Sequence, residues 1–193
     1  MPPLRILYDH QVFDVQRYGG ISRYFSELIN ELLSDEDVCV RLGMRFSSNG
    51  HISNQRYAGT FTDRRNVWLG MGRALDMIDG ASGTGAARMR RLLGIAANNR
   101  RTSSKAIEHG DFDVLHPTYY DPYFLSHLKG RPFVLTIHDM IHERFAAGAK
   151  DDPTIARKKE LATKADRIIV VSESTKRDVV EMLGIPSDKI HVT

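Results

Sequence analysis

Two short stretches of the sequence combine residue types that could act on a hydroxylated or phosphorylated substrate. His138 and Asp139 follow an apolar run at 132–137, where an imidazole can hydrogen-bond a hydroxyl group or exchange a proton near neutral pH. Gly19 and Gly20 open a helical pattern, where backbone N–H groups can approach a phosphate or diphosphate closely. The structural alternatives are a histidine that only ends a strand and a glycine pair that only makes a turn.

These residues fall where an open parallel sheet binds its ligands, which is at the carboxyl ends of its strands. The strands predicted from apolar runs end at Tyr8, His116, Ile137 and Val171, so the loops that follow them are the expected site. The polar side chains at those ends are Asp9, His10, His116, Tyr119, Tyr120, His138, Asp139 and Ser172.

The histidines do not predict a metal site. His138 and His142 are four residues apart, with Asp139 and Glu143 beside them, and on a helix this spacing could bring two imidazoles to one metal ion. His138 belongs to a strand end, however, and the glutamate placement of a zinc metalloprotease helix is missing. We therefore predict no metal ligands in this chain.

Other nucleotide-binding and catalytic motifs are missing from the sequence. A dinucleotide-binding G-x-G-x-x-G turn would have to follow the first strand at once, and residues 4–8 are not followed by one. Its nearest imitation, at 83–87, follows no strand. There is also no G-x-S-x-G elbow and no Walker A sequence. Nicotinamide chemistry is therefore not expected.

Short apolar runs alternate with helical patterns along most of the chain. Unbroken apolar runs such as 4–8 are typical of strands in parallel sheets, and the apolar residues of 21–33 recur at the spacing of an amphipathic helix. The predicted strands are 4–8, 38–42, 113–116, 132–137, 167–171 and 189–192. The predicted helical segments are 21–33, 86–109, 123–128, 153–164 and a last helix that ends before Gly184. This alternation predicts an α/β fold, a Rossmann-like parallel sheet with helices on both faces.

Capping signals mark the ends of two helices. Asp152 followed by Pro153 is typical of an N-cap and the first helical residue. Ser172 or Ser174 is expected to cap the last helix, and Gly184 to close it.

The composition is that of an ordinary globular protein, with 41% hydrophobic and 26% charged residues and a net charge of +3. Cys39 lies in an apolar run and is predicted to be a small buried hydrophobe, and one thiol cannot form an internal disulfide. The sequence shows no signal-peptide pattern and no run of about 18 apolar residues. We therefore expect a cytoplasmic protein that is neither secreted nor membrane-spanning.

The middle of the chain is basic. Residues 43–62 are predicted as loop, 67–78 as helical and 80–85 as a flexible stretch, and we expect 43–110 to be an elaboration over one end of the sheet. No Asp or Glu lies between Asp79 and Glu108, and this gap contains Arg88, Arg90, Arg91, Arg100, Arg101 and Lys105. Segment 86–105 could contact an anionic membrane surface, and the alternatives are a solvated basic face or a nucleic-acid contact with steep salt dependence.

Four motifs in register resemble the amino-terminal domain of retaining glycosyltransferase family 4. They are YGGISRY at 18–24, DVLH at 113–116, TIHD at 136–139 and ADRIIVVSES at 165–174. The resemblance spans nearly the whole chain and is weakest over 43–110. It implies one half of a GT-B fold, in which two Rossmann-like domains face each other across a cleft. In that family the first domain holds mostly the acceptor and the second mostly the nucleotide-sugar donor.

The resemblance also implies roles for single residues. Gly19 and Gly20 would line the donor diphosphate, and His138 would be the catalytic residue that touches the donor sugar. The residues expected on the acceptor side are Arg23, His116 and Tyr119. The reaction would transfer a hexosyl-type sugar with retention to a glycan or lipid-linked acceptor, without an obligatory metal or other cofactor. Bacterial surface polysaccharide or lipopolysaccharide assembly is the setting that the resemblance implies.

By the same resemblance, residues 1–193 match the acceptor-side domain, and residues 189–193 match the strand that leads into an Asn-Gly linker. The linker, a basic pair and an E-x7-E element belong to the donor-binding domain, which we expect to be absent from this chain. We therefore expect the chain alone to be inactive. The alternative from another class is a noncatalytic sugar- or nucleotide-binding module whose fold is Rossmann-like for packing reasons only. Nucleic acid is not among the expected partners.

Overall fold

The computed structural model describes residues 2–45, 47, 49–52, 85–145 and 152–193, with side chains described from 97 onward in the helix that starts at 85. Within these residues the strands are β1 (Leu4–Tyr8), β2 (Val38–Leu42), β3 (Val114–His116), β4 (Val134–Ile137), β5 (Arg167–Val170) and β6 (Ile190–Val192). All pairings are parallel, in the orders β2-β1-β3 and β4-β5-β6. An isolated parallel bridge joins Leu115 to Phe133, so the two sheets meet edge to edge.

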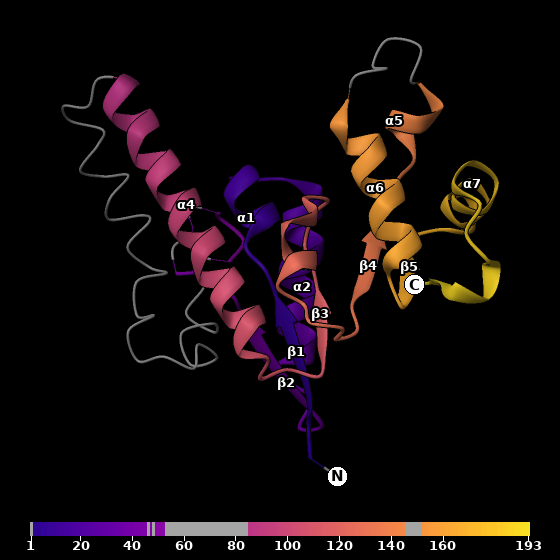
Figure 1. The fold of residues 1–193 in the computed structure, drawn as a ribbon, viewed down its shortest axis with the longest axis horizontal. Coiled ribbons are helices and arrows are strands. Elements are labelled where there is room, and N and C mark those ends of the chain that lie inside the picture. The colour runs from indigo at the N-terminus through magenta and orange to yellow at the C-terminus, as the bar shows by residue number, and fades with distance from the viewer. Residues whose placement is uncertain (1, 46, 48, 53–84, 146–151) are drawn as a thin grey trace.

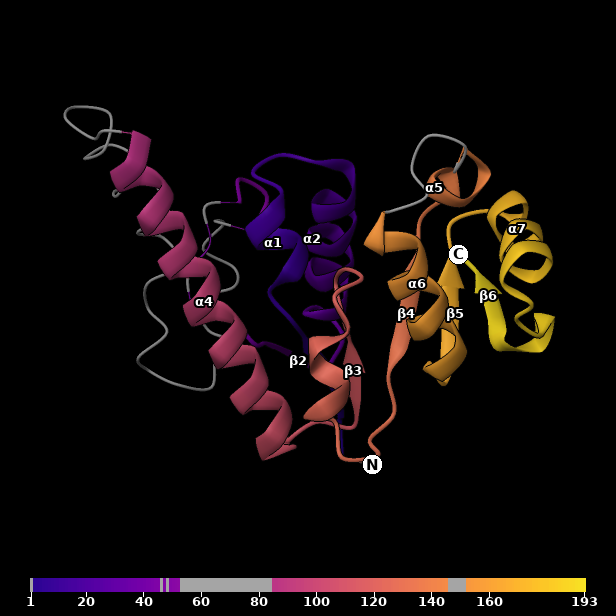
Figure 2. The same cartoon turned by 45° about the horizontal axis from the view of Figure 1, so that its top comes forward.

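Helices cover both faces of this sheet, as the sequence predicts (Figure 1). Helix α2 (Gly20–Leu32) lies on one face, and α4 (Gly85–His109), the 3-10 helix η3 (Pro122–Ser126) and α6 (Pro153–Lys164) lie on the other. Figure 2 shows the long helix α4 running past one side of the first sheet, with α7 (Glu173–Leu183) at the far end of the second sheet.

The alternation of side chains along β1 explains why both faces are covered. Leu7 belongs to one buried cluster together with Ile107 of α4 and Leu115 of β3. Tyr8 belongs to a second cluster and packs on Phe25 of α2 with ring centroids 6.1 Å apart. Successive side chains of a strand point to opposite faces, so a strand with apolar residues at both positions needs a helix on each side.

The chain order places a topological switch point between β1 and β3. From β1 the chain crosses through α2 to β2 on one side, and β3 lies on the other side of β1. Neighbouring loops that leave a parallel sheet in opposite directions open a crevice at the carboxyl ends of the strands, where such folds bind ligands. The loops after β1 and β3 therefore frame the expected site.

The capping predictions are confirmed. The side chain of Asp152 accepts a hydrogen bond from Thr154 N, with Pro153 as the first residue of α6. Ser172, rather than Ser174, caps α7 by accepting from Thr175 N. Gly184 ends α7 in the left-handed region with φ of 70°, a conformation that costs glycine little because it has no Cβ.

The prediction for Cys39 is wrong, because its side chain is exposed. β2 is an edge strand of the described sheet, and Val40 of that strand is buried in the cluster that α2 covers. The side chain of Cys39 points to the opposite face of the strand. Apolar neighbours in the sequence therefore did not indicate burial at this position.

Two short helices are not among the predicted helical segments. They are α1 (Gln11–Val15), directly after β1, and α5 (Ile141–Arg144), after β4. Both are too short to show a helical period, and neither has a side-chain cap. The predicted helical pattern at 67–78, most of the predicted loop at 43–62 and the flexible stretch at 80–84 lie outside the described residues.

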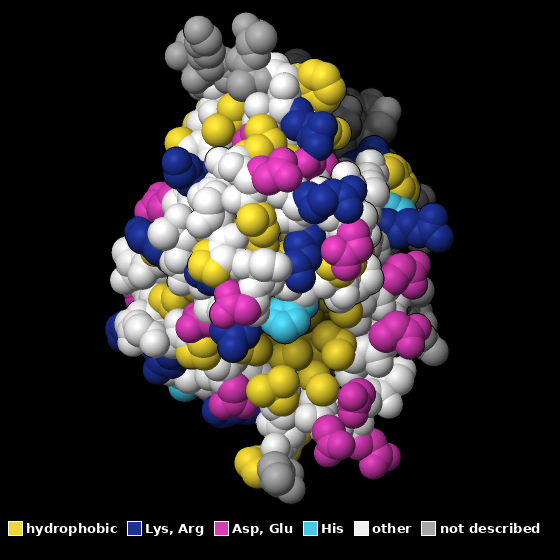
Figure 3. All heavy atoms as spheres, turned by 90° about the vertical axis from the view of Figure 1, so that its right-hand side faces the viewer, with side chains coloured by type: hydrophobic (Ala, Val, Ile, Leu, Met, Phe, Trp, Pro, Cys, Tyr) yellow, Lys and Arg dark blue, Asp and Glu magenta, His cyan; other side chains and the backbone are white. Residues whose placement is uncertain are grey.

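The side of the molecule that carries α7 has a mixed surface (Figure 3). Lys and Arg side chains are intermixed there with Asp and Glu among the described residues, and hydrophobic side chains gather in one patch beside a histidine in the lower part of the view. The exposed apolar residues of this half include Val171, Met182 and Val192. In the described part of the chain, no helix is long and apolar enough to cross a membrane.

A buried ion pair joins α6 to the segment after β4. Lys158 Nζ lies 3.0 Å from Glu143 Oε2, and the two side chains are 1% and 4% exposed. The same ammonium donates to the carbonyl of Asp139 at 3.0 Å and lies 5.2 Å from the centroid of the Tyr120 ring. Removing one partner of such a pair leaves an uncompensated buried charge, which is far more costly than removing both.

We expect Lys158→Met to lower the free energy of unfolding by about 3–5 kcal/mol, measured by urea denaturation, because Glu143 would keep its buried charge without a partner. The double variant Lys158→Met, Glu143→Leu should recover most of that loss. The matched control is Lys164→Met, which removes an exposed pair with Glu160 on the same helix and should change stability by less than about 1 kcal/mol. A double variant no better than the single one would contradict this account.

Candidate functional site

The Asp9 carboxylate holds together the two loops at the switch point. Its side chain is fully buried, and it accepts hydrogen bonds from Thr118 N at 2.9 Å, Thr118 Oγ1 at 2.7 Å and the side-chain amide of Gln11 at 2.7 Å. The Tyr123 hydroxyl donates a further bond at 3.2 Å. Gln11 in turn pairs with the backbone of Asp121 in both directions. The loops after β1 and β3 are therefore one rigid unit.

The first turn of α2 lies beside the end of β4. Tyr24, one turn into α2, meets the His138 ring edge-on with centroids 5.0 Å apart. Gly19 is the N-cap, and Gln16 replaces a capping side chain by accepting from Ser22 N at 3.0 Å. A Cβ on Gly19 would collide with that Gln16 side chain, whereas a Cβ on Gly20 would meet nothing within 4 Å. There is thus open space against the backbone at Gly20, at the positive end of the helix.

Arg23 occupies the same turn of α2 and faces solvent. Its side chain is 70% exposed and forms only a loose pair with Glu27, with Nε 3.8 Å from Oε1. Gly19, Gly20 and Arg23 thus belong to the start of α2, whose Tyr24 contacts His138. Their contacts with donor or acceptor stay predictions.

The His138 imidazole is half-buried, and one of its nitrogens has no partner. Its Nε2 is enclosed and makes no hydrogen bond within the described residues. Burial lowers the pKa of the ring to about 4, against a smaller opposite effect of Asp139, so it is neutral at pH 7. Most buried polar atoms in folded proteins are hydrogen-bonded, so an unmet one at a strand end is a candidate for a ligand contact.

His116 lies beneath His138 inside the core. It is 5% exposed, its Nε2 is 2.8 Å from Thr136 Oγ1, and its ring packs on Tyr8 and Phe25. Burial lowers the pKa of His116 to about 3, with a smaller contribution from His138. In this structure the His116 side chain makes core contacts with Tyr8, Phe25 and Thr136. The acceptor contact that the sequence predicts for His116 stays a prediction.

A cavity of about 460 Å³ opens between α1, α4, the loop after β3 and the start of α6. Tyr119, the third residue expected on the acceptor side, forms part of its wall and packs on Tyr120 with ring centroids 4.9 Å apart. The cavity is lined by His10, Gln11, Asp14, Val15, Ala97, Arg100, Tyr119, Tyr120, Asp121, Thr154 and Arg157. A space of this size is large enough for a small organic ligand such as a sugar residue.

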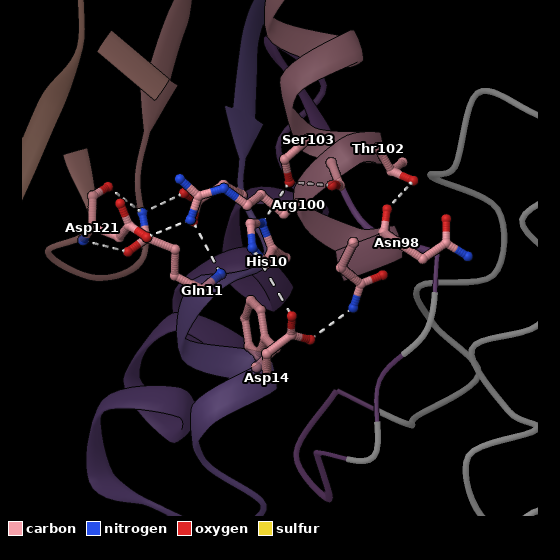
Figure 4. Close-up of polar contacts among 12 residues, drawn as sticks. His10, Gln11, Asp14, Asn98, Arg100, Thr102, Ser103 and Asp121 are labelled. Atoms are coloured by element: carbon pink, nitrogen blue, oxygen red, sulfur yellow. Dashed lines mark hydrogen bonds and ion pairs between the residues drawn. The ribbon is translucent and has the colours of Figure 1, made fainter. Parts of the chain in front are cut away.

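Arg100 of α4 is anchored at the cavity wall rather than free in solvent. Its guanidinium is 2.6 Å from Asp121 Oδ2 and lies 4.8 Å from the centroid of the Tyr123 ring. Figure 4 shows this arginine between the loop after β3 and the short helix α1. One member of the basic segment predicted for membrane contact therefore belongs to a pocket.

His10 and Asp14 form a buried pair at the same cavity (Figure 4). His10 Nδ1 is 2.8 Å from Ser103 Oγ, and His10 Nε2 is 4.0 Å from Asp14 Oδ2. Asp14 Oδ1 accepts from the Asn99 amide at 2.7 Å, while Oδ2 is buried without a hydrogen bond in the described residues. Burial raises the pKa of Asp14 to about 7, although the Asn99 bond opposes this, and burial lowers the pKa of His10.

The described residues contain no cluster of three or more His, Cys, Asp or Glu side chains placed to hold a metal ion. Of the residues weighed for such a site, Glu143 pairs with Lys158, and His142 lies 3.6 Å from Asp152. These side chains are occupied by protein contacts that link α5 to α6.

The comparison with protein families agrees with this geometry. The family model described as Glycosyltransferase Family 4 matches residues 18–193. The match covers most of the chain, and the chain belongs to this family of glycosyltransferases. A comparison with curated proteins found no match.

Only some of the residues at the cavity could be predicted from the sequence. His10 and Tyr119 were named because they follow strands, and Arg100 was named only as part of a basic segment. Asn99 and Ser103 gave no signal, because α4 is far from β1 in the sequence and only the fold brings them to His10 and Asp14. The isolated acidic residue in the apolar run Val12 to Val15 was the one available hint.

We expect Asp14→Asn to stabilise the chain above pH 7. The folded state raises the pKa of Asp14 from 3.8 to about 7, so the folded state binds a proton more tightly and loses stability as pH rises through that window. At pH 8 the buried charge should cost roughly 2–4 kcal/mol, which the neutral amide removes. Urea denaturation at pH 4 and pH 8 checks this. An equal difference between variant and wild type at both pH values would show that Asp14 is not the titrating group.

Proposed function

We propose that this chain is the acceptor-side half of a two-domain glycosyltransferase. The reaction would move a hexosyl-type sugar from a nucleotide sugar to a glycan or lipid-linked acceptor, with retention of the anomeric configuration. Family membership supports sugar transfer in general. The observation that carries the finer proposal is the meeting of His138, with its unpartnered buried Nε2, and the first turn of α2 at the carboxyl edge of the sheet.

On the donor side, the first turn of α2 supplies the electrostatics. The open space at Gly20 lets a diphosphate approach the backbone at the start of the helix, where Ser22 N already donates to Gln16 and the other first N–H groups have no acceptor within the helix. Negative charge develops on the diphosphate as the sugar leaves, and a preorganised helix end stabilises that charge. His138, neutral at pH 7, would hydrogen-bond the donor sugar rather than act as a cation. No metal or other cofactor is required by this arrangement.

On the acceptor side, the cavity beside Tyr119 is the proposed docking place. It lies next to the same edge, because Tyr120 in its wall shares a hydrogen bond with the backbone of His138. Arg23 of α2 is exposed and only loosely paired with Glu27, and we propose that it meets a charged acceptor group. We propose surface polysaccharide assembly at the cytoplasmic side of a membrane as the setting.

The test uses the longest natural protein that contains this chain. Nucleotide release is measured against a panel of nucleotide sugars for the wild type and for His138→Ala, which should lower kcat at least about 100-fold because a contact at the reacting sugar is lost. His127→Ala is the matched control, because this exposed histidine pairs with Glu108 away from the site.

We also expect residues 1–193 alone to release no nucleotide.

Two outcomes would count against the proposal. If the folded wild-type protein releases nucleotide from no donor, the noncatalytic sugar- or nucleotide-binding module becomes the better description. If His138→Ala releases nucleotide as fast as the control, the chain is a transferase in which His138 has another role.

We propose in addition that helix α4 touches an anionic membrane. Its sequence carries Arg88, Arg90 and Arg91 toward one end, followed by the exposed Arg101 and Lys105, with no acidic residue before Glu108. Basic helices bind anionic headgroups, with about 1 kcal/mol for each cation near the surface. A membrane on this side would bring a lipid-linked acceptor close to the cavity at α4.

Vesicle co-sedimentation tests this contact. Vesicles with anionic lipid should bind the chain, whereas neutral vesicles should not, and the triple variant Arg88→Glu, Arg90→Glu, Arg91→Glu should abolish binding. The control is Arg167→Glu, Lys176→Glu, Arg177→Glu in the other half of the chain, which should retain it. Equal sedimentation with both kinds of vesicle would refute the contact.

A further inference from the structure

The hydrogen bonds around His10 fix which of its ring nitrogens carries the proton. Ser103 Oγ donates to the carbonyl of Gly43, which can only accept. The Tyr123 hydroxyl donates to Asp9. Neither hydroxyl has a second proton, so His10 Nδ1 must be the donor in its 2.8 Å contact with Ser103 Oγ. In the neutral ring, Nε2 is then the acceptor nitrogen of a residue that lines the cavity.

Asp14 presents a second bare acceptor beside it. Its Oδ1 is held by the amide of Asn99, and its Oδ2 has no hydrogen bond in the described residues. The distance of 4.0 Å between Oδ2 and His10 Nε2 is too long for a direct hydrogen bond. His10 and Asp14 thus both line one cavity, and the buried Asp14 Oδ2 lacks a donor within the described residues, 4.0 Å from His10 Nε2.

We propose that His10 and Asp14 recognise a vicinal diol of the acceptor sugar, with one hydroxyl donating to His10 Nε2 and its neighbour donating to Asp14 Oδ2. The inference rests on the proposed function, because it takes the ligand to be the acceptor of the transfer. A single hydroxyl has one proton and satisfies one of the two atoms. A pair on adjacent carbons satisfies both.

The rest of the cavity suits a sugar ring. Tyr119 and Tyr120 are among its lining residues, next to polar neighbours, and an aromatic ring in such a wall can pack on the C–H side of a pyranose while the hydroxyls reach acceptors. Arg100 is neutralised by Asp121, so the charges at the wall are nearly balanced when Asp14 is ionised and Arg157 is counted. A neutral hydroxylated ring therefore matches this wall better than a strongly charged group.

Recognition of the diol should depend on pH. Below about 7 the Asp14 carboxyl is protonated and Oδ2 can lose its role as an acceptor, so binding should weaken at pH 6 relative to pH 8. The charged and titratable groups around the pair are Asp9 after β1, Arg100 of α4, Asp121 before η3, Tyr123 of η3 and Arg157 of α6. Arg100 and Asp121 oppose each other, and the Tyr123 pKa is raised far above neutral, so Asp14 dominates the response between pH 6 and 8.

The test is an NMR titration of the isotope-labelled chain with methyl hexopyranosides of gluco, manno and galacto configuration. Binding of at least one should shift the His10 ring signals. Monodeoxy forms that lack either hydroxyl of the bound pair should bind about tenfold more weakly, since each removes one hydrogen bond to a buried acceptor. Asp14→Asn should lose binding by a similar factor, because its amide places a donor where an acceptor is needed. Asp188→Asn, an exposed change in the other half of the chain, is the matched control.

The outcomes separate this inference from the proposed function. His10 signals that do not move with any glycoside, or glycoside binding that Asp14→Asn leaves intact, would mean that the pair holds water only and would overturn the inference. The transferase proposal is judged independently by nucleotide release that depends on His138. In the longest protein, a raised acceptor KM with unchanged kcat for Asp14→Asn would support both. An unchanged acceptor KM would refute only the diol contact.

Discussion

The arrangement depends on one buried carboxylate at the switch point of the sheet. Asp9 accepts hydrogen bonds from both loops that leave the sheet there, and Gln11 adds two bonds to the backbone of Asp121, so the loop after β3 is held to the loop after β1. The acceptor cavity depends on that position. Tyr119, Tyr120 and Asp121 reach the cavity because Thr118 is pinned to Asp9, and His10 faces α4 because it is the next residue along the chain.

The sequence predicted the scaffold well, because the scaffold is encoded locally. Unbroken apolar runs located every described strand, and Asp152, Ser172 and Gly184 marked helix ends through contacts with residues a few positions away. It failed where burial was decided by neighbours distant in the sequence. Cys39 is exposed because of where β2 lies in the sheet, and α1 forms where Asp9 and Thr118 fix the chain, with no helical period to announce it.

Only the locally encoded part of the candidate site could be predicted from the sequence. Strand ends can be read from a sequence, so His10, His138 and Tyr119 could be named as candidates. The partners that give these residues their chemistry come from elsewhere, such as Asn99 and Ser103 from α4 and Tyr24 from α2. Asp14 is a buried carboxylate with only one of its two oxygens hydrogen-bonded within the described residues. A carboxylate kept half-satisfied in a buried place costs stability, and proteins retain such groups where a ligand completes their hydrogen bonds.

Lys158 contacts both the segment after His138 and the wall of the cavity. Its ammonium touches the carbonyl of the residue that follows His138 and also lies over the ring of Tyr120, which stands in the cavity wall. The side chain is enclosed and ion-paired, so it cannot adjust to one neighbour without disturbing the other. The proposed donor place at His138 and the proposed acceptor place at the cavity therefore have one enclosed cation as a common neighbour. A substitution of Lys158 would remove contacts at both places, because the side chain touches a residue of each.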